Sequence, residues 1–314
     1  MRLRDAIHQY IAWRRDHGAK YESSATILYL FLKSVKGGID CDAVATDRVL
    51  AFLAGKGALT RYRENKHGAL AGFYRYAISR GYATRSPLPD NEPRPPASAS
   101  PHIYSCDELR RLFNAVGDSR QRGFQLDADT FRTLLFLLYG AGLRVGEARR
   151  LTLADVDLHE AVLTIRDTKF FKSRLVPIGT QLSAMLKIYA SLRESRPFLQ
   201  GKNSFFLANR DGTQLYHRTI IAAFAKLLHA ADVHSASGER PSPRLHDFRH
   251  SFAVHRLTEW YRQDADVQRL LPLLSTYLGH ADMEGTKVYL SMTPELLQQA
   301  STRFERYANG GNHA

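Results

Sequence analysis

Apolar residues recur at helical spacing over most of this chain. In residues 1–87 the pattern covers AIHQYIAW, SATILYLFLKSV, VATDRVLAFLA and ALTRYRENKHGALAGFYRYAISRGY. Later it covers DTFRTLLFLLYGAG and segments 180–195, 216–231, 244–260, 266–279 and 294–308. Apolar positions three or four apart predict amphipathic helices. AVLTIRDT and SRLVPI instead predict two strands of a hairpin, with KFFK at the turn. The pattern therefore predicts a mainly helical protein with one small sheet.

A proline-rich segment separates two parts of this pattern. It contains Pro87, Pro89, Pro93, Pro95, Pro96 and Pro101. Proline at this density excludes a helix and stiffens a linker. Ser105 and Glu108 then form a capping-box pattern that marks a new helix start. We therefore expect a helical domain at 1–87, a linker at 88–102 and a second domain at 103–314.

The net charge of the chain indicates which class of partner it binds. The 314 residues carry a net charge of +13 and a pI of about 9.8, which favours a polyanion, DNA ahead of an anionic membrane surface. No apolar run reaches the ~20 residues of a membrane span. Cys41 and Cys106 cannot form a disulfide framework. These features favour a DNA-binding protein of the reducing cytoplasm, associated with the nucleoid.

Basic residues cluster among aromatic ones at the end of the first domain. For any one of them a solvated charged face is as good an explanation as a phosphate contact. As a set in a basic domain they predict contacts with the DNA backbone. The candidates are Arg61, Arg63, Lys66, Arg75 and Arg80.

Three motifs of the second domain contain residues suited to phosphodiester chemistry. They are AGLRVGEARRL at 141–151, HDFRH at 246–250 and LGHADMEGTKVYL at 278–290. Arginine stays charged, and its planar fork can hold two phosphate oxygens, so Arg144 and Arg249 are candidate phosphate ligands. His246 lies three residues before Arg249, on the same helix face. Tyr289 offers a phenol as nucleophile.

Together these motifs resemble the tyrosine recombinases, the phage-integrase and Xer type of site-specific recombinase. The resemblance implies an N-terminal helical, SAM-like core-binding bundle and a mixed α+β catalytic domain. It implies strand cleavage by tyrosine, a 3′-phosphotyrosyl link, and no metal or cofactor. It also implies a homotetramer on double-stranded DNA with paired inverted core sites, with or without a partner recombinase. The implied catalytic residues are Arg144, Lys169, His246, Arg249, His280 and Tyr289, supported by Glu147.

Several residue assignments stay open. Lys172 and Arg174 compete with Lys169 as general acid, and Tyr277 competes with Tyr289 as nucleophile. Either His246 or the phosphate could take the tyrosine proton. The resemblance makes His250 a structural helix residue. Phe170 and Phe171 replace the glycine or small polar residues that the family has at the hairpin turn.

The function also has alternatives. A type IB topoisomerase uses a similar catalytic set, and an inactive DNA-binding protein is a second alternative. The interval from Arg249 to His280 is longer than in Xer-type proteins and resembles recombinases of transposable elements. The last predicted helix has an apolar stripe that packs either on its own domain or on a neighbouring protomer. The stripe consists of Leu297, Ala300, Phe304 and Tyr307.

Overall fold

The chain divides into two compact units, Met1–Ser98 and Ala99–Ala314. The computed structural model describes residues 1–35, 38–54, 61–89, 100–117, 126–166, 173–196, 201–235, 242–280, 284–291, 297–302 and 305. The boundary between the units falls within the proline-rich segment, of which residues 90–99 lie outside the described part. Each unit has its own buried apolar cluster.

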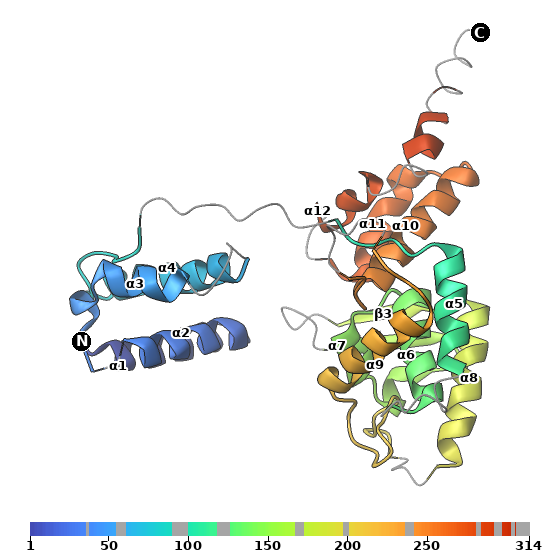
Figure 1. The fold of residues 1–314 in the computed structure, drawn as a ribbon, viewed down its shortest axis with the longest axis horizontal. Helices are drawn as coiled ribbons and strands as arrows, with labels where there is room; N and C mark the ends of the chain where they lie inside the picture. The colour runs from blue at the N-terminus through green and yellow to red at the C-terminus, as the bar shows by residue number, and fades with distance from the viewer. Residues whose placement is uncertain are drawn as a thin grey trace. The chain divides into compact units, whose positions relative to one another are not determined.

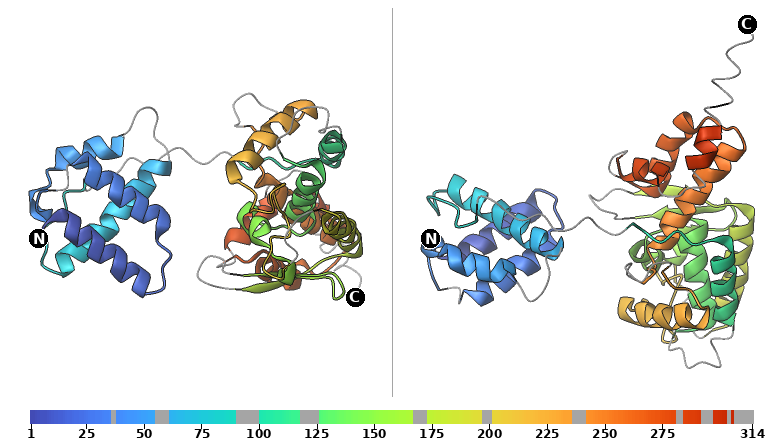
Figure 2. Two further views of the ribbon diagram at one scale, coloured as in Figure 1. Left: turned by 90° about the horizontal axis from the view of Figure 1, so that it is seen from below. Right: turned by 45° about the horizontal axis from the view of Figure 1, so that its top comes forward.

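The described residues of the first unit form a bundle of four α-helices, coloured blue to cyan in Figure 2. They are α1 (Leu3–Asp16), α2 (Glu22–Ser34), α3 (Thr46–Ala54) and α4 (Arg61–Ser79), with a short 3₁₀ helix η1 (Cys41–Ala43). Helix α4 packs against the other three. Its buried face presents Leu70, Phe73 and Tyr74 to the core. The predicted helical pattern of the first domain is thus present in the described residues.

Lys66 belongs to this packing and is not an open surface cation. Its Nζ donates a hydrogen bond to the Phe52 carbonyl at 2.6 Å. The ammonium also lies 4.6 Å from the ring centre of Phe52 and 5.1 Å from that of Tyr62. Burial, followed by the charge of Arg63, lowers the pKa of Lys66. In this structure Lys66 joins α3 to α4, and its contact with DNA stays a prediction.

The second unit is mainly helical with a three-stranded sheet, as the pattern predicted (Figure 1). Helix α6 (Ala128–Gly140) packs against α5 (Cys106–Gly117), α7 (Val145–Arg150), α8 (Thr180–Glu194) and α10 (Asp247–Arg262). The remaining helices are α9 (His217–Ala230), α11 (Val267–Leu278), α12 (Glu284–Lys287) and the 3₁₀ helices η3 (Leu153–Asp155) and η5 (Val288–Ser291). Helix α6 is buried on most sides because these neighbours cover it.

The sheet is antiparallel with the order β1-β2-β3. It consists of β1 (Val156–Asp157), β2 (Val162–Ile165) and β3 (Arg174–Pro177). Strands β2 and β3 are the predicted hairpin, and Leu163 pairs with Val176 on the buried face. The two-residue strand β1 was not predicted, because so short a segment shows no alternation.

Side-chain caps mark some of the helix starts, those of α5, α6 and α11 among them. The expected capping box is confirmed: Ser105 N donates to Glu108 Oε2 at 2.7 Å, and Glu108 N donates to Ser105 Oγ at 3.1 Å. Helix α10 begins at Asp247, later than expected. The Asp247 carboxylate accepts from the backbone N–H of Arg244 at 2.8 Å and closes a turn before the helix.

The C-terminal segment is described only in part. Residues 297–302 are helical, whereas Phe304 and Tyr307 of the predicted stripe lie outside the described residues. Within the described part of the chain, no helix combines the length and apolarity needed to cross a membrane.

Replacing Lys66 by alanine should destabilise the first unit by about 1–3 kcal/mol, because a charged hydrogen bond and two ring contacts are lost. Arg75→Ala is the matched control, since Arg75 is exposed on the same helix. Thermal melting of the isolated 1–98 segment measures the difference. Unchanged melting of Lys66→Ala, together with weaker DNA binding, would make Lys66 a phosphate contact after all.

Candidate active site

The C-terminal end of α11 organises the site. Gly279 follows the helix with φ +69° and ψ +47°. Its N–H donates to Thr276 O, and the N–H of His280 donates to Ser275 O, both at 3.0 Å. This is a Schellman arrangement, in which a left-handed glycine ends the helix. It leaves the next three carbonyls, those of residues 277–279, to find partners outside the helix.

Three arginines supply those partners, one for each carbonyl. Arg174 Nε donates to Tyr277 O at 2.8 Å, and Arg249 Nη2 donates to Leu278 O at 2.6 Å. Arg144 Nη2 donates to Gly279 O at 3.2 Å. These carbonyls form the negative end of the helix dipole, so cationic donors are favoured there. The arginines come from β3, from α10 and from the residue that precedes α7.

Glu147 joins two of these arginines. Its Oε1 accepts from Arg144 Nη1 at 2.8 Å and from Arg174 Nη1 at 3.1 Å. Its Oε2 accepts from Arg174 Nη2 at 2.9 Å and from the Arg144 backbone N–H at 3.0 Å. Burial would raise the pKa of Glu147, but hydrogen bonds and charge from Arg174, and then from Arg144, outweigh it and lower the pKa to about 2. Glu147 is therefore ionised at neutral pH.

Arg249 is almost fully buried, with 1% of its surface exposed. Its Nη1 donates to the Gly142 carbonyl at 2.7 Å, which fixes the second branch of the guanidinium. Burial and the positive charge of Arg144 lower the pKa of Arg249 to about 10. The side chain stays cationic at neutral pH, so it remains an electrostatic ligand for an anion.

Tyr289 lies against this cluster. It belongs to η5, and only 2% of it is exposed. Burial raises the pKa of Tyr289, whereas the nearby Arg249 and then the charge of Arg144 oppose the rise. The His280 ring lies 6.1 Å from the Tyr289 ring, centre to centre. His280 Nδ1 is 2.6 Å from the buried Thr286 Oγ1, which orients the imidazole.

His246 and His250 form the remaining side of the cluster. His246 is the exposed N-cap residue of α10. Surrounding protein atoms and then the charges of Arg249 and Arg144 lower its pKa. The His250 ring lies 4.7 Å from that of His246 and 5.5 Å from that of Tyr289. His250 was expected to be purely structural. Its contact with both rings was missed, although its position four residues after His246 was a signal.

The structure separates the competing residues. The hydroxyl of Tyr277 donates to the Pro177 carbonyl at 3.1 Å, and burial raises the pKa of Tyr277 to about 12. The Arg174 side chain is paired with Glu147 and only 10% exposed, so it is no candidate for the general acid. Lys169, Lys172, Phe170 and Phe171 lie outside the described residues.

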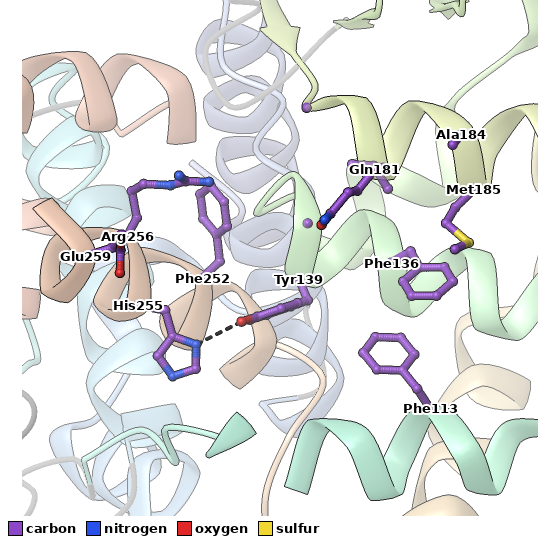
Figure 3. A pocket seen from close by; sticks show the side chains of 13 residues that line it. Phe113, Phe136, Tyr139, Gln181, Ala184, Met185, Phe252, His255, Arg256 and Glu259 are labelled. Atoms are coloured by element: carbon purple, nitrogen blue, oxygen red, sulfur yellow. Dashed lines mark hydrogen bonds between the residues drawn. The ribbon is translucent and has the colours of Figure 1, made fainter. Parts of the chain in front are cut away.

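A separate pocket of about 710 Å³ lies between α5, α6, α8 and α10 (Figure 3). Phe113, Phe136 and Met185 give it an apolar lining. His255 Nδ1 lies 2.9 Å from the Tyr139 hydroxyl beside this pocket. His255 and Tyr139 both line this pocket. In the described part of the chain, no group of three or more His, Cys, Asp or Glu residues is placed to hold a metal ion.

The other basic candidates lie in the first unit. Arg61, Arg63 and Arg75 belong to α4, and Arg80 follows its last residue. Arg61, Arg75 and Arg80 are exposed. The Arg80 guanidinium lies 5.5 Å from the centre of the Tyr76 ring. All four cations are thus on or next to one helix.

Known proteins are similar to this chain in sequence and in fold. Residues 105–295 match the phage integrase family. A Sinorhizobium fredii protein named as an integrase/recombinase, y4rB, is 36% identical, with 97% of each chain covered. The Tn1549 transposon integrase in complex with transposon right end DNA has a TM-score of 0.67 at 15% identity, covering 98% of this chain and all of its own. A lambda integrase tetramer bound to a Holliday junction has a TM-score of 0.64 at 16% identity, covering 92% and 77%.

The chain belongs to the phage integrase family and is a tyrosine-type site-specific DNA recombinase. The predicted family and the predicted fold class are both confirmed. Because the similar proteins are recombinases and integrases, they favour recombination over the topoisomerase and the inactive DNA-binding alternatives.

Replacing Gly279 by alanine should destabilise the second unit by at least about 1–2 kcal/mol, the cost of a left-handed non-glycine residue. The added Cβ would also lie 2.8 Å from Arg174 Nη1 and 3.0 Å from its Cζ. Gly201→Ala is the control, because its Cβ would have 3.7 Å to the nearest atom. Chemical unfolding of both variants measures the difference. Equal stabilities would contradict the close packing of Arg174 on this glycine.

Proposed function

We propose that Tyr289 is the nucleophile of a DNA strand-transfer reaction. Its oxygen forms a bond to the scissile phosphorus, and the bond to the 5′ oxygen breaks. The product is a 3′-phosphotyrosyl link and a free 5′ hydroxyl. Attack by a 5′ hydroxyl of the partner strand reverses the chemistry and releases the tyrosine. The observation that carries the proposal is the place of the buried Tyr289, whose ring lies 5.5 Å from that of His250 and 6.1 Å from that of His280, beside the arginine cluster.

Arg144 and Arg249 hold the nonbridging phosphate oxygens in this proposal. Fixed cationic donors aimed at developing negative charge give the largest stabilisation in such reactions. Both guanidiniums are already oriented by α11 carbonyls, so little reorganisation is needed. His246 and His280 flank the same space and can donate further hydrogen bonds to phosphate oxygens. Glu147 orients Arg144.

Lys169 is the general acid in this proposal, on the strength of its position in the family resemblance. A lysine stays protonated at neutral pH until the 5′ oxygen leaves. The Tyr289 proton passes to His246 or to the phosphate. His250 is a poor acceptor, because burial and the charge of His246 lower its pKa to about 3.

The substrate is double-stranded DNA with paired inverted core sites. The net charge of +13 and the exposed arginines of α4 support backbone contacts by the first unit. We propose a homotetramer, in line with the lambda integrase tetramer on a Holliday junction. A role in a mobile element accords with the similarity to the Tn1549 transposon integrase.

Trapping on a nicked suicide substrate should give a covalent protein–DNA adduct. Tyr289→Phe should abolish the adduct and leave DNA binding nearly unchanged, since only one hydroxyl is lost. Tyr277→Phe is the matched control and should still form it. Denaturing gels of labelled DNA distinguish the two. An adduct that persists in Tyr289→Phe and disappears in Tyr277→Phe would transfer the nucleophile to Tyr277.

Arg144→Ala should slow single-turnover cleavage by on the order of 10²-fold or more, as loss of an oxyanion donor does. Arg249→Lys keeps the charge but loses the planar fork and should also be slow. Quench-flow rates at saturating DNA measure both effects, with thermal melting as the folding check. Wild-type rates in a folded Arg144→Ala variant would exclude this residue as a phosphate ligand.

Deletion after Pro294 tests the assembly. Leu297 is half exposed in the described helical segment, and we propose that this segment docks on a neighbouring protomer. The truncated protein should bind a single site as wild type does but fail to pair two sites. Native gels with one-site and two-site DNA report both states. Tetramers that still form on DNA would show that the segment packs on its own unit.

A further inference from the structure

Arg174 has no assigned role in the chemistry, yet its side chain makes more hydrogen bonds in the site than that of Arg144 or Arg249. It is the first residue of β3, beside the hairpin turn. Its Nε, Nη1 and Nη2 donate to Tyr277 O and to the two oxygens of Glu147. All three of its nitrogens are engaged by protein acceptors, so Arg174 keeps fewer donors for a phosphate than Arg144 or Arg249, each of which has two such bonds. Any effect of Arg174 on catalysis must therefore pass through its partners.

Of the two partners of Arg174, Glu147 is the one that can affect catalysis, because its carboxylate also accepts a hydrogen bond from Arg144. One carboxylate is placed between two guanidiniums, with Oε1 shared by an Nη1 from each. Arg144 gives one N–H to Glu147 and one to the Gly279 carbonyl, of the five on a guanidinium. Its side chain is 37% exposed, whereas that of Glu147 is 3% exposed. The more exposed Arg144 can thus reach a ligand, while the buried Arg174 neutralises the Glu147 carboxylate.

Removing Arg174 would leave the charge of Glu147 to be neutralised by Arg144 alone. The buried carboxylate of Glu147 would have Arg144 as its one remaining guanidinium partner. A buried carboxylate draws as many hydrogen bonds as it can, because an uncompensated charge is costly there. Arg144 would turn its fork onto Glu147 and away from the phosphate.

We propose that Arg174 is a positioning residue for DNA cleavage, which occupies Glu147 so that Arg144 keeps its fork available for the scissile phosphate. This inference rests on the proposed function, in which Arg144 binds that phosphate.

Arg174→Met is the test variant, and Arg166→Met is its control. Arg166 directly follows β2 on the other arm of the hairpin and pairs with Asp155 rather than with Glu147. At saturating DNA, single-turnover adduct formation by Arg174→Met should fall on the order of 10- to 100-fold, as small misplacements of catalytic groups do. Arg166→Met should cleave at nearly the wild-type rate. Arg174→Lys, which restores the charge, should recover part of the loss and serves if Arg174→Met does not fold.

Two further measurements separate positioning from other roles. A substrate with a 5′-bridging sulfur needs no general acid, so it should not rescue Arg174→Met if the defect lies at Arg144. The defect of Arg174→Met relative to the wild type should also become smaller as the pH drops below neutral, because a protonated Glu147 no longer carries the charge that draws Arg144 away from the phosphate. Arg174 lowers the pKa of Glu147, so its loss raises that pKa and protonates the carboxylate at higher pH. The double variant Arg174→Met/Glu147→Gln should lack this additional pH dependence.

Each outcome decides the inference. A wild-type rate in Arg174→Met overturns it, as does an equal loss in Arg166→Met. Rescue by the sulfur substrate also overturns it, because Arg174 would then serve the leaving group. If the wild-type protein itself forms no adduct, the proposed function fails first, and that result is distinct from all of these.

Discussion

Helix α11 ends with three carbonyls that its own backbone cannot satisfy, and the rest of the site depends on how they are paired. Arg174, Arg249 and Arg144 each donate to one of them, from three different elements. Unpaired carbonyls at a buried helix end are costly, and charged donors are the strongest partners they can have. The same bonds that end the helix therefore bring two candidate phosphate ligands together.

This arrangement brings three positively charged guanidiniums together in a partly buried site at the end of α11. Glu147 is ionised and compensates Arg174 and Arg144, while Arg249 relies on carbonyls and on Tyr289. Burial and the charge of Arg144 both disfavour the cationic form of Arg249 and so lower its pKa. A bound phosphate would supply the missing negative charge. The site is therefore better matched to an anionic ligand than to its free state, as electrostatically organised catalytic sites are.

Patterns within short stretches were sufficient for most of the fold. The helical period and the Ser105–Glu108 box predicted helices that the structure contains, and alternation predicted the β2–β3 hairpin. The two-residue strand β1 and the start of α10 at Asp247 were beyond such patterns. The first is too short to show a period, and the second depends on one hydrogen bond that the Arg244 backbone N–H donates to the Asp247 carboxylate.

The sequence by itself determined which residue types could do the chemistry, because arginine, histidine and tyrosine occur in three recognisable motifs. Only the tertiary structure decided which of them meet. Arg174 and Glu147 are 27 positions apart, and no local rule pairs them. Lys66 and Arg75 look alike in the sequence, but one is held by α3 and the other is exposed. Tyr277 and Tyr289 differ in the same way, since the Tyr277 hydroxyl donates to a strand carbonyl and the Tyr289 ring lies beside the rings of His250 and His280. The physical reason is that hydrogen bonding and burial depend on neighbours brought in by packing, which a single stretch of sequence does not contain.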